Sequence, residues 1–206
     1  TPITQVASVV HVLVVNPNLP VKSVAELVAY SRQNPGKLSY GSTGMGTGFH
    51  LATEQFLYNA GIKSLHVPYR GESPLITDLI GGQVDFAFSS MGSRSLAEQG
   101  KLVMLAYTGD KRSPLLPNIP TAKELGVAHV SSGWLGFAIP AGVPAPVRDK
   151  LIAALTSAVN DPEVVANFTK GGGEPRNLSG DAFAARVKRE LDELRALNKD
   201  LKLTIE

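Results

Sequence analysis

The chain has 206 residues, of which 43% are hydrophobic and 18% are charged, a composition ordinary for a globular protein with a sizeable core. Its formal net charge of +2 comes without a long basic run, so nucleic acid is not expected as a partner. The absence of cysteine excludes disulfides, thiol nucleophiles and thiolate metal sites. No apolar run approaches the roughly 20 residues of a membrane helix. Residues 1–15 lack a signal-peptide pattern, which excludes no compartment because an exported protein loses its signal.

The first part of the chain alternates between predicted strands and helices. The valine-rich stretch 6–17 predicts one buried strand that stops at Asn16-Pro17. Ser23 and Glu26 form a capping box that opens a helix ending near Asn34-Pro35-Gly36. Further strands are expected at 37–41, 64–69, 84–88 and 102–108, and further helices from about 48, from Ser73-Pro74 and from about 94. This alternation predicts a largely parallel sheet covered by helices.

The last third of the chain has a different order. Thr121 and Glu124 form a second capping box, expected to open a short helix. One strand is predicted at 133–140, followed by helices over about 146–160, from Asp161-Pro162 and from Ser179 onward. Because one strand cannot cover the apolar stripes of three helices, we expect this part to be a fraction of a domain. The boundary between the two parts is expected near 125–135.

The stretch "YGSTGMGTGFH" (40–50) is the main candidate binding site. It is neither a P-loop, since no Gly-Lys-Ser/Thr follows, nor a dinucleotide fingerprint, since the third glycine is missing. Its hydroxyls, its glycines and the expected helix start suit an anion, because glycines let backbone amides turn toward a ligand and a helix start is positively polarised. The candidate ligand residues are Ser42, Thr43, Gly44, Gly46 and Thr47. A tight turn capped by Thr47, without any ligand, explains the same pattern.

Other polar residues follow predicted strand ends, where ligands of parallel sheets collect. Arg70, after Tyr69, could bind an anion or lie in solvent, and Ser89-Ser90 end a strand in the same way. His50 and Glu54 lie one helical turn apart and could share a metal ion, but no third ligand or H-E-x-x-H motif accompanies them. With no nucleophile elbow and no cofactor motif either, no metal, no cofactor and no catalytic residue is expected.

Several longer runs resemble one family. The runs are "NPNLPVKSVAELVAYSRQNPGKLSYGSTGMGTGFHLATEQF", "HVPYRGESPLITDLIGGQVDFAF", "GKLVMLAYTGDKRSPLLPNIPTAKELG", "AIPAGVPAPVRDKL" and "DPEVVANF". In this order and spacing they are similar to the receptors of tripartite tricarboxylate transporters, the Bug family of periplasmic solute-binding proteins. The resemblance covers nearly all of the chain.

The resemblance implies a periplasmic-binding-protein fold of the second type, in which two α/β lobes close around a small carboxylate. It implies that the glycine-rich turn of the second lobe holds a ligand carboxylate through amides and hydroxyls. Residues 42–47 match that turn here, and Tyr69, Arg70, Ser89 and Ser90 would face the same cleft. The ligand would be a di- or tricarboxylate, an amino acid or an aromatic acid, and the partners would be membrane transporter subunits in a periplasmic setting.

One departure from the family pattern is large, because no residue here matches the half-lobe that precedes this region in the family. We therefore expect 6–125 to form a complete α/β lobe and 130–206 to form the incomplete C-terminal share of the other lobe. Such a chain would expose apolar faces and would either pack in a new way or form a homo-oligomer. Two function classes stay open: a receptor that carries an organic anion without catalysis, and an enzyme that uses the same cleft for phosphate or acyl chemistry.

Overall fold

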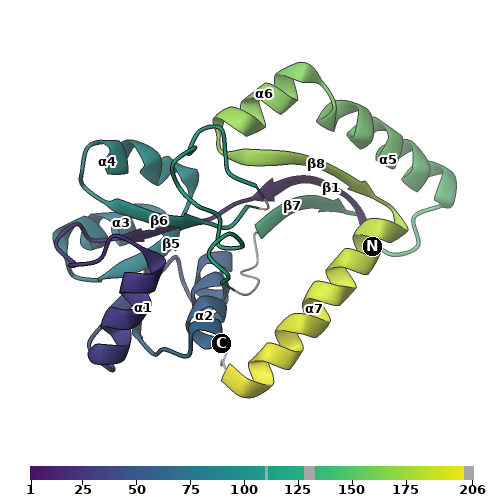
Figure 1. Cartoon of the computed structure of the whole chain (residues 1–206). Coiled ribbons are helices and arrows are strands. Elements are labelled where there is room, and N and C mark those ends of the chain that lie inside the picture. The colour runs from purple at the N-terminus through teal and green to yellow at the C-terminus, as the bar shows by residue number, and fades with distance from the viewer. Residues whose placement is uncertain (110, 128–132, 202–206) are drawn as a thin grey trace. The chain divides into compact units, whose positions relative to one another are not determined.

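The computed structural model describes residues 1–109, 111–127 and 133–201 (Figure 1). The contacts divide the chain into two compact units. Unit 1 combines residues 1–9 with the segment that begins at Gly133, and unit 2 begins at Val10 and contains the residues between. Each unit has its own sheet: three strands in the order β7-β1-β8 in unit 1, and five strands in the order β4-β3-β5-β2-β6 in unit 2.

Unit 2 contains the alternating strands and helices that the sequence predicted. In chain order they are β2 (Val12–Val15), α1 (Val24–Gln33), β3 (Ser39–Ser42), α2 (Gly48–Ala60), β4 (Leu65–Pro68), α3 (Glu72–Gly81), β5 (Phe86–Ser89), a 3₁₀ turn (Met91–Ser93), α4 (Arg94–Glu98) and β6 (Val103–Tyr107). Strand β3 is parallel to β4 and β5, whereas β2 is antiparallel to β5 and β6. The sheet is therefore largely parallel, with β2 as the reversed strand.

Two hydrophobic cores lie on the two faces of this sheet. Successive side chains of a strand point to opposite faces, so Leu13 and Val15 pack with α1 and α2, whereas Val12 and Val14 pack with α3. All four residues of β2 are buried. A continuous apolar run is what a strand covered on both faces requires. The helices thus hold the carboxyl ends of β3, β4 and β5 side by side at one edge of the sheet.

The predicted strand over 6–17 is wrong, because the structure contains two strands there. Strand β1 (Pro2–Val9) is the central strand of the unit 1 sheet, and β2 belongs to unit 2. Residues 6–9, expected in the complete lobe with 10–125, thus pair with strands of the C-terminal part. A valine-rich run satisfies either sheet equally well, so hydrophobicity alone does not reveal the break at Val10 and His11. Whether the two units are a complete and an incomplete lobe stays a prediction.

Unit 1 has three strands where one was predicted. Strands β7 (Gly133–Ala138) and β8 (Gly173–Ser179) both pair antiparallel with β1, and they are accompanied by α5 (Ala145–Val159), α6 (Pro162–Lys170) and α7 (Asp181–Leu201). The last helix begins at Asp181 rather than at Ser179, because Ser179 still belongs to β8. The expectation that one strand must receive three helices is therefore corrected.

Two helix starts also differ from the prediction. Helix α3 is capped by Gly71 and begins at Glu72, before the predicted cap at Ser73. Thr121 and Glu124 make both capping-box hydrogen bonds, but 121–126 is a turn and not a helix. In contrast, the Ser23 hydroxyl accepts the Glu26 amide at the start of α1, as predicted, while the Glu26 carboxylate accepts the Lys22 amide.

A polar network joins α7 to the sheet of unit 1. The Trp134 indole and the Arg186 guanidinium both donate to the Glu190 carboxylate, at 2.6 and 2.7 Å. Arg186 also donates to the Gln5 side-chain oxygen at 2.8 Å, which reaches the buried central strand β1. Trp134 packs edge-on against Phe183, with ring centroids 5.0 Å apart. Within unit 1, Trp134 thus packs against α7.

Gly136→Ala is expected to destabilise unit 1 by about 1–3 kcal/mol, because the new methyl group would overpack a closed contact. A Cβ at this position would lie 2.6 Å from the buried Phe183 ring and 3.1 Å from the Thr4 carbonyl oxygen. Gly171→Ala is the matched control within unit 1, since φ there is −77° and the nearest atoms to a new Cβ lie at an ordinary contact distance of 3.5 Å. Urea unfolding followed by Trp134 fluorescence measures both. Equal stability of the two variants would contradict the packing described here.

Candidate functional site

Three turns meet at one edge of the unit 2 sheet. Since β4, β3 and β5 are adjacent and parallel, the segments that follow Pro68, Ser42 and Ser89 leave the sheet side by side. Two of these segments lead into helices of ten residues or more, α2 and α3. The amide-rich starts of these helices carry partial positive charge. The topology thus gathers donors for an anion at this edge.

The turn between β3 and α2 is stabilised by its own hydroxyl groups. The Thr43 hydroxyl donates to the Thr47 hydroxyl at 3.1 Å, and Thr47 donates to the Gly44 carbonyl at 2.8 Å. The Thr47 hydroxyl also accepts the His50 amide at 3.5 Å, which makes Thr47 the N-cap of α2 as the sequence predicted. The Ser42 hydroxyl donates to the Gly44 carbonyl at 3.1 Å, so all three predicted ligand hydroxyls are already engaged inside the turn.

The amides of this turn fall into two groups. The Gly44 amide donates to the Ser42 hydroxyl at 3.2 Å, the Gly46 amide to Nδ1 of His50 at 3.1 Å, and the Thr47 amide to the Gly44 carbonyl at 3.4 Å. Within the described ranges, four other amides have no hydrogen-bond partner, those of Thr43, Met45, Gly48 and Phe49. These four are the donors that the turn can offer to a ligand.

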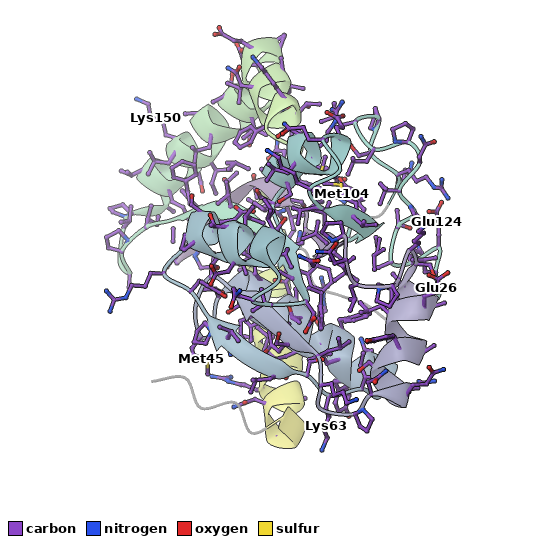
Figure 2. The ribbon with its side chains drawn as sticks, turned by 90° about the vertical axis from the view of Figure 1, so that its left-hand side faces the viewer. Glu26, Met45, Lys63, Met104, Glu124 and Lys150 are labelled. Carbon is purple, nitrogen blue, oxygen red and sulfur yellow. The ribbon has the colours of Figure 1, made fainter. Side chains whose placement is uncertain are left out.

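Positive backbone angles at Gly44 and Gly46 make this arrangement possible. Their φ values are 127° and 71°, a region that residues with a Cβ rarely adopt. The residue between them, Met45, is 46% exposed and is labelled at the surface in Figure 2. The two glycines therefore turn the backbone sharply on either side of an exposed residue whose amide is unpaired in the described part of the chain.

An aromatic and histidine cluster lies beneath the turn. The His66 ring stacks on the His50 ring at 4.3 Å and on the Tyr40 ring at 4.7 Å. Nε2 of His66 lies 2.7 Å from the Ser42 hydroxyl, and the Tyr40 hydroxyl donates to the Glu54 carboxylate. Strands β3 and β4 and helix α2 thus each contribute to one packed group. The sequence considered His50 with Glu54 as a metal pair, but the structure joins Glu54 to Tyr40 instead.

Burial keeps the histidines of this region neutral at pH 7. Burial, followed by the nearby His50, lowers the pKa of His66 to about 4. Burial also lowers the pKa of His50, although the Glu54 carboxylate opposes this. The pKa of Tyr40 is raised, first by burial and then by its hydrogen bond to Glu54. Across the described ranges, no group of three or more His, Asp or Glu side chains is placed to hold a metal ion.

The turn after β4 brings Tyr69 and Arg70 to the same edge of the sheet. The Tyr69 amide donates to the Ser42 carbonyl, and its hydroxyl donates to Asp78 at 2.9 Å. Burial and this hydrogen bond raise the pKa of Tyr69 to about 12. Arg70 is exposed, and none of the ion pairs in the described part of the chain involves it. Of this pair, only the Arg70 guanidinium is available to an incoming anion without breaking a side-chain hydrogen bond.

Ser89, the last residue of β5, and Ser90, which follows it, form hydrogen bonds within the protein. Ser89 is fully buried and lies 2.5 Å from the Ser93 hydroxyl, and the Ser90 hydroxyl accepts the Gly92 amide. The Ser90 amide donates to the Glu72 carboxylate at 2.6 Å. The Glu72 carboxylate, in the first turn of α3, thus accepts a hydrogen bond from one of the backbone amides at this edge. The role of Ser89 and Ser90 in ligand binding stays a prediction.

Backbone donors and helix starts at the carboxyl ends of parallel strands define a class of α/β proteins that bind small anions. Within that class, the chain belongs to the tripartite tricarboxylate transporter receptor family, TctC, whose family model matches residues 1–203. It is 34% identical over 191 residues to a Cupriavidus necator protein described as "UPF0065 protein in gbd 5'region", covering 93% of this chain and 58% of that relative. The chain thus spans somewhat more than half the length of this relative.

Solved structures confirm the expected fold. The R. palustris protein Rpa4515, solved with adipate, is 32% identical with a TM-score of 0.85, and the match covers 97% of this chain and 67% of that one. The periplasmic binding protein BugD is 29% identical with a TM-score of 0.83, and the match covers 100% of this chain and 70% of BugD. BugD is a periplasmic binding protein by description. The predicted resemblance to the Bug receptors is therefore confirmed.

Proposed function

We propose that this chain is the greater part of a periplasmic receptor that captures a small organic carboxylate for a tripartite tricarboxylate transporter and performs no catalysis. The observation that carries the proposal is the turn 42–49, where four amides without a partner in the described ranges meet the start of a 13-residue helix. A carboxylate can accept several backbone donors at once, and a helix start stabilises it further. Adipate in the related Rpa4515 structure supports a carboxylate as ligand class.

The ligand residues that we propose lie on two of the three turns. Thr43, Met45 and Gly48 would donate through the backbone, and exposed Arg70 would add a charge at the next turn. The hydroxyls of Ser42, Thr43 and Thr47 would then shape the turn more than they contact the ligand. Membrane subunits of the transporter would be the protein partners. Within the described residues no helix has the length and apolarity to cross a membrane.

Binding is tested by calorimetry of the 206-residue chain with adipate, succinate, citrate, glutamate and benzoate, which cover the expected ligand classes. At least one acid is expected to bind and to raise the melting temperature, because a ligand that binds only the native state stabilises it. The ligand recovered afterwards is expected to be chemically unchanged, whereas turnover would favour the enzyme alternative. Failure of every acid to bind would contradict the proposal for this chain.

Thr47→Ala is expected to weaken binding of the best acid by about three- to tenfold, because it removes the cap of α2 and the contact that closes the turn on Gly44. Thr169→Ala is the matched control, because the Thr169 hydroxyl is exposed and donates to the Val165 carbonyl within α6 of unit 1. Calorimetry compares the dissociation constants. Equal loss in both variants, or no loss in either, would argue against binding at this turn.

A further inference from the structure

We propose that His50 and His66 are positioning residues of the glycine-rich turn: the two imidazoles fix the Gly46 amide and the Ser42 hydroxyl, and so determine which amides remain for the anion. The inference rests on the proposed function, because it concerns how the same turn is held. Neither histidine needs to contact the ligand. Their effect would be exerted through the backbone between β3 and α2.

His50 closes the turn from the first turn of α2. Its Nδ1 accepts the Gly46 amide at 3.1 Å, and the side chain is almost completely buried. Since Nδ1 acts as an acceptor, the ring must be neutral and carry its hydrogen on Nε2. A buried amide that loses its acceptor is costly. The Gly46 amide is therefore held toward the interior as long as position 50 supplies an acceptor there.

His66 acts on the other end of the turn. Its Nε2 lies 2.7 Å from the hydroxyl of fully buried Ser42, which itself accepts the Gly44 amide. If Nε2 of His66 donates, the Ser42 hydrogen is left for the Gly44 carbonyl at 3.1 Å, and all three contacts of Ser42 are satisfied. The Gly44 amide is thus held inward through Ser42, as the Gly46 amide is held by His50.

Packing keeps both rings in place. The two imidazoles stack at 4.3 Å, and the Tyr40 ring, anchored by Glu54, stacks on His66 at 4.7 Å and lies 6.4 Å from His50. Rotation of either ring would break a stacking contact as well as a hydrogen bond. Burial disfavours the charged form of both rings, which keeps Nδ1 of His50 available as an acceptor near neutral pH.

The consequence is an alternation along the turn. The amides of Gly44 and Gly46 already donate to acceptors within the turn and α2. The amides of Thr43 and Met45 have no hydrogen-bond partner in the described part of the chain. Donors that are fixed before the ligand arrives bind it better than donors that must first be ordered. The histidine pair would therefore act by preorganising the turn for an anion.

Two substitutions at position 50 separate the acceptor from the ring. His50→Asn keeps an acceptor, because the Asn oxygen and Nδ1 of His are both two bonds from Cβ. His50→Phe keeps a stacking ring but has no acceptor. With adipate as probe at pH 7.5, we expect His50→Phe to lose about tenfold or more in affinity and His50→Asn to stay within about threefold of the unchanged chain. Equal affinities of the unchanged chain and His50→Phe would overturn the inference.

A measurement on the unchanged chain keeps the inference testable if the variants do not fold. In ¹⁵N NMR spectra at pH 7.5, we expect Nδ1 of His50 to be unprotonated and the Gly46 amide to exchange with solvent much more slowly than the Met45 amide. A protonated Nδ1, or equal exchange of the two amides, would overturn the inference. If the unchanged chain binds no acid, the proposed function fails, and the NMR result still decides how the turn is held.

Discussion

Acidification from pH 7 to pH 4 is expected to lower the free energy of unfolding of unit 2. In the His11→Phe variant, this decrease is expected to be smaller by up to about 3 kcal/mol. His11 is only 3% exposed, and Nδ1 is one of the few buried polar side-chain atoms in the described ranges without a hydrogen-bond partner. Burial lowers the pKa of His11 from 6.5 to about 4. Phenylalanine would keep the ring contact with Phe49 and would leave no unpaired nitrogen.

The direction of this pH dependence follows from which state, native or unfolded, binds the proton. Below pH 6.5 the unfolded chain protonates this histidine, whereas the native unit does not until about pH 4. The unfolded state then binds more protons, so stability falls as the pH falls through this window and levels off below it. His66, whose pKa is also lowered to about 4, and His50, whose pKa is lowered, act in the same direction. The contribution of His11 is therefore fully present above about pH 6.5.

Hydrogen exchange of the Phe86–Ser89 peptide measures the unfolding free energy of unit 2 separately from that of unit 1. The exchange is followed as a function of urea concentration at pH 7, 5.5 and 4. As the pH falls, unit 2 of the unchanged chain is expected to lose more unfolding free energy than unit 2 of the His11→Phe variant. Trp134 fluorescence, which reports on unit 1, is the internal control and should not change with the substitution. A difference that is constant from pH 7 to pH 4 would contradict burial of a neutral histidine at this position.

The 206-residue chain is expected to self-associate through unit 1. Several large apolar side chains of this unit are 40–50% exposed: Leu135, Phe137, Val147, Leu151 and Leu191. Leu135 and Phe137 share the face of β7 opposite the one where Gly136 contacts Phe183. Large exposed apolar patches are uncommon on monomers, so we expect Leu135 and Phe137 to mark a face that associates. An alternative packing of the C-terminal part was the other expectation from the sequence, and it stays a prediction.

Light scattering after gel filtration would report the mass in solution. Protein concentrations on the order of 1–100 µM cover weak association. We expect a mass above the 21.8 kDa of one chain, and a shift toward it in the double variant Leu135→Ser, Phe137→Ser. Leu65→Ser is the control, because Leu65 is 66% exposed on β4 of unit 2. A single chain at every concentration, or equal effects of the control, would argue against association through this face.

The helix starts that depend on neighbouring residues were largely predictable. The Ser23 cap of α1, the Thr47 cap of α2 and the Asp161 cap of α6 all form as expected, since each needs only a side chain and an amide two or three residues away. Thr121 shows the limit of such reasoning. Its capping box forms without a helix, because the hydrogen bonds of a cap are compatible with a simple turn.

Strand partners were harder to predict because they come from distant parts of the chain. The stretch that forms β8 contains glycine and Pro175, which are unfavourable in strands. Strand β8 lies at the edge of its sheet, where a missing amide donor is tolerated. Among the described residues its one strand partner is β1, more than 160 residues earlier in the chain. No local pattern connects the two.

The candidate site was predictable as a place but not as a set of contacts. Glycines, hydroxyls and a helix start located the turn at 42–47, but the hydroxyls of Thr43 and Thr47 are bonded within it. His50 and His66, separated by 16 positions, meet because β3 and β4 are neighbours. The sequence indicated His66 only as a strand residue. A polar residue within a strand next to a glycine-rich turn is the one signal that could have drawn attention to it.

The central position of β1 also bears on how the chain acquires its structure during synthesis. Within the described residues unit 2 occupies one continuous stretch, so its sheet can form as soon as residues up to Tyr107 are available. Strand β1 precedes this stretch, yet both of its partners, β7 and β8, follow it. At about 5–20 residues per second, the ribosome needs on the order of ten seconds or more to supply β8. We therefore expect unit 2 to become protease-resistant first, while β1 stays without its strand partners until β7 and β8 have been synthesised.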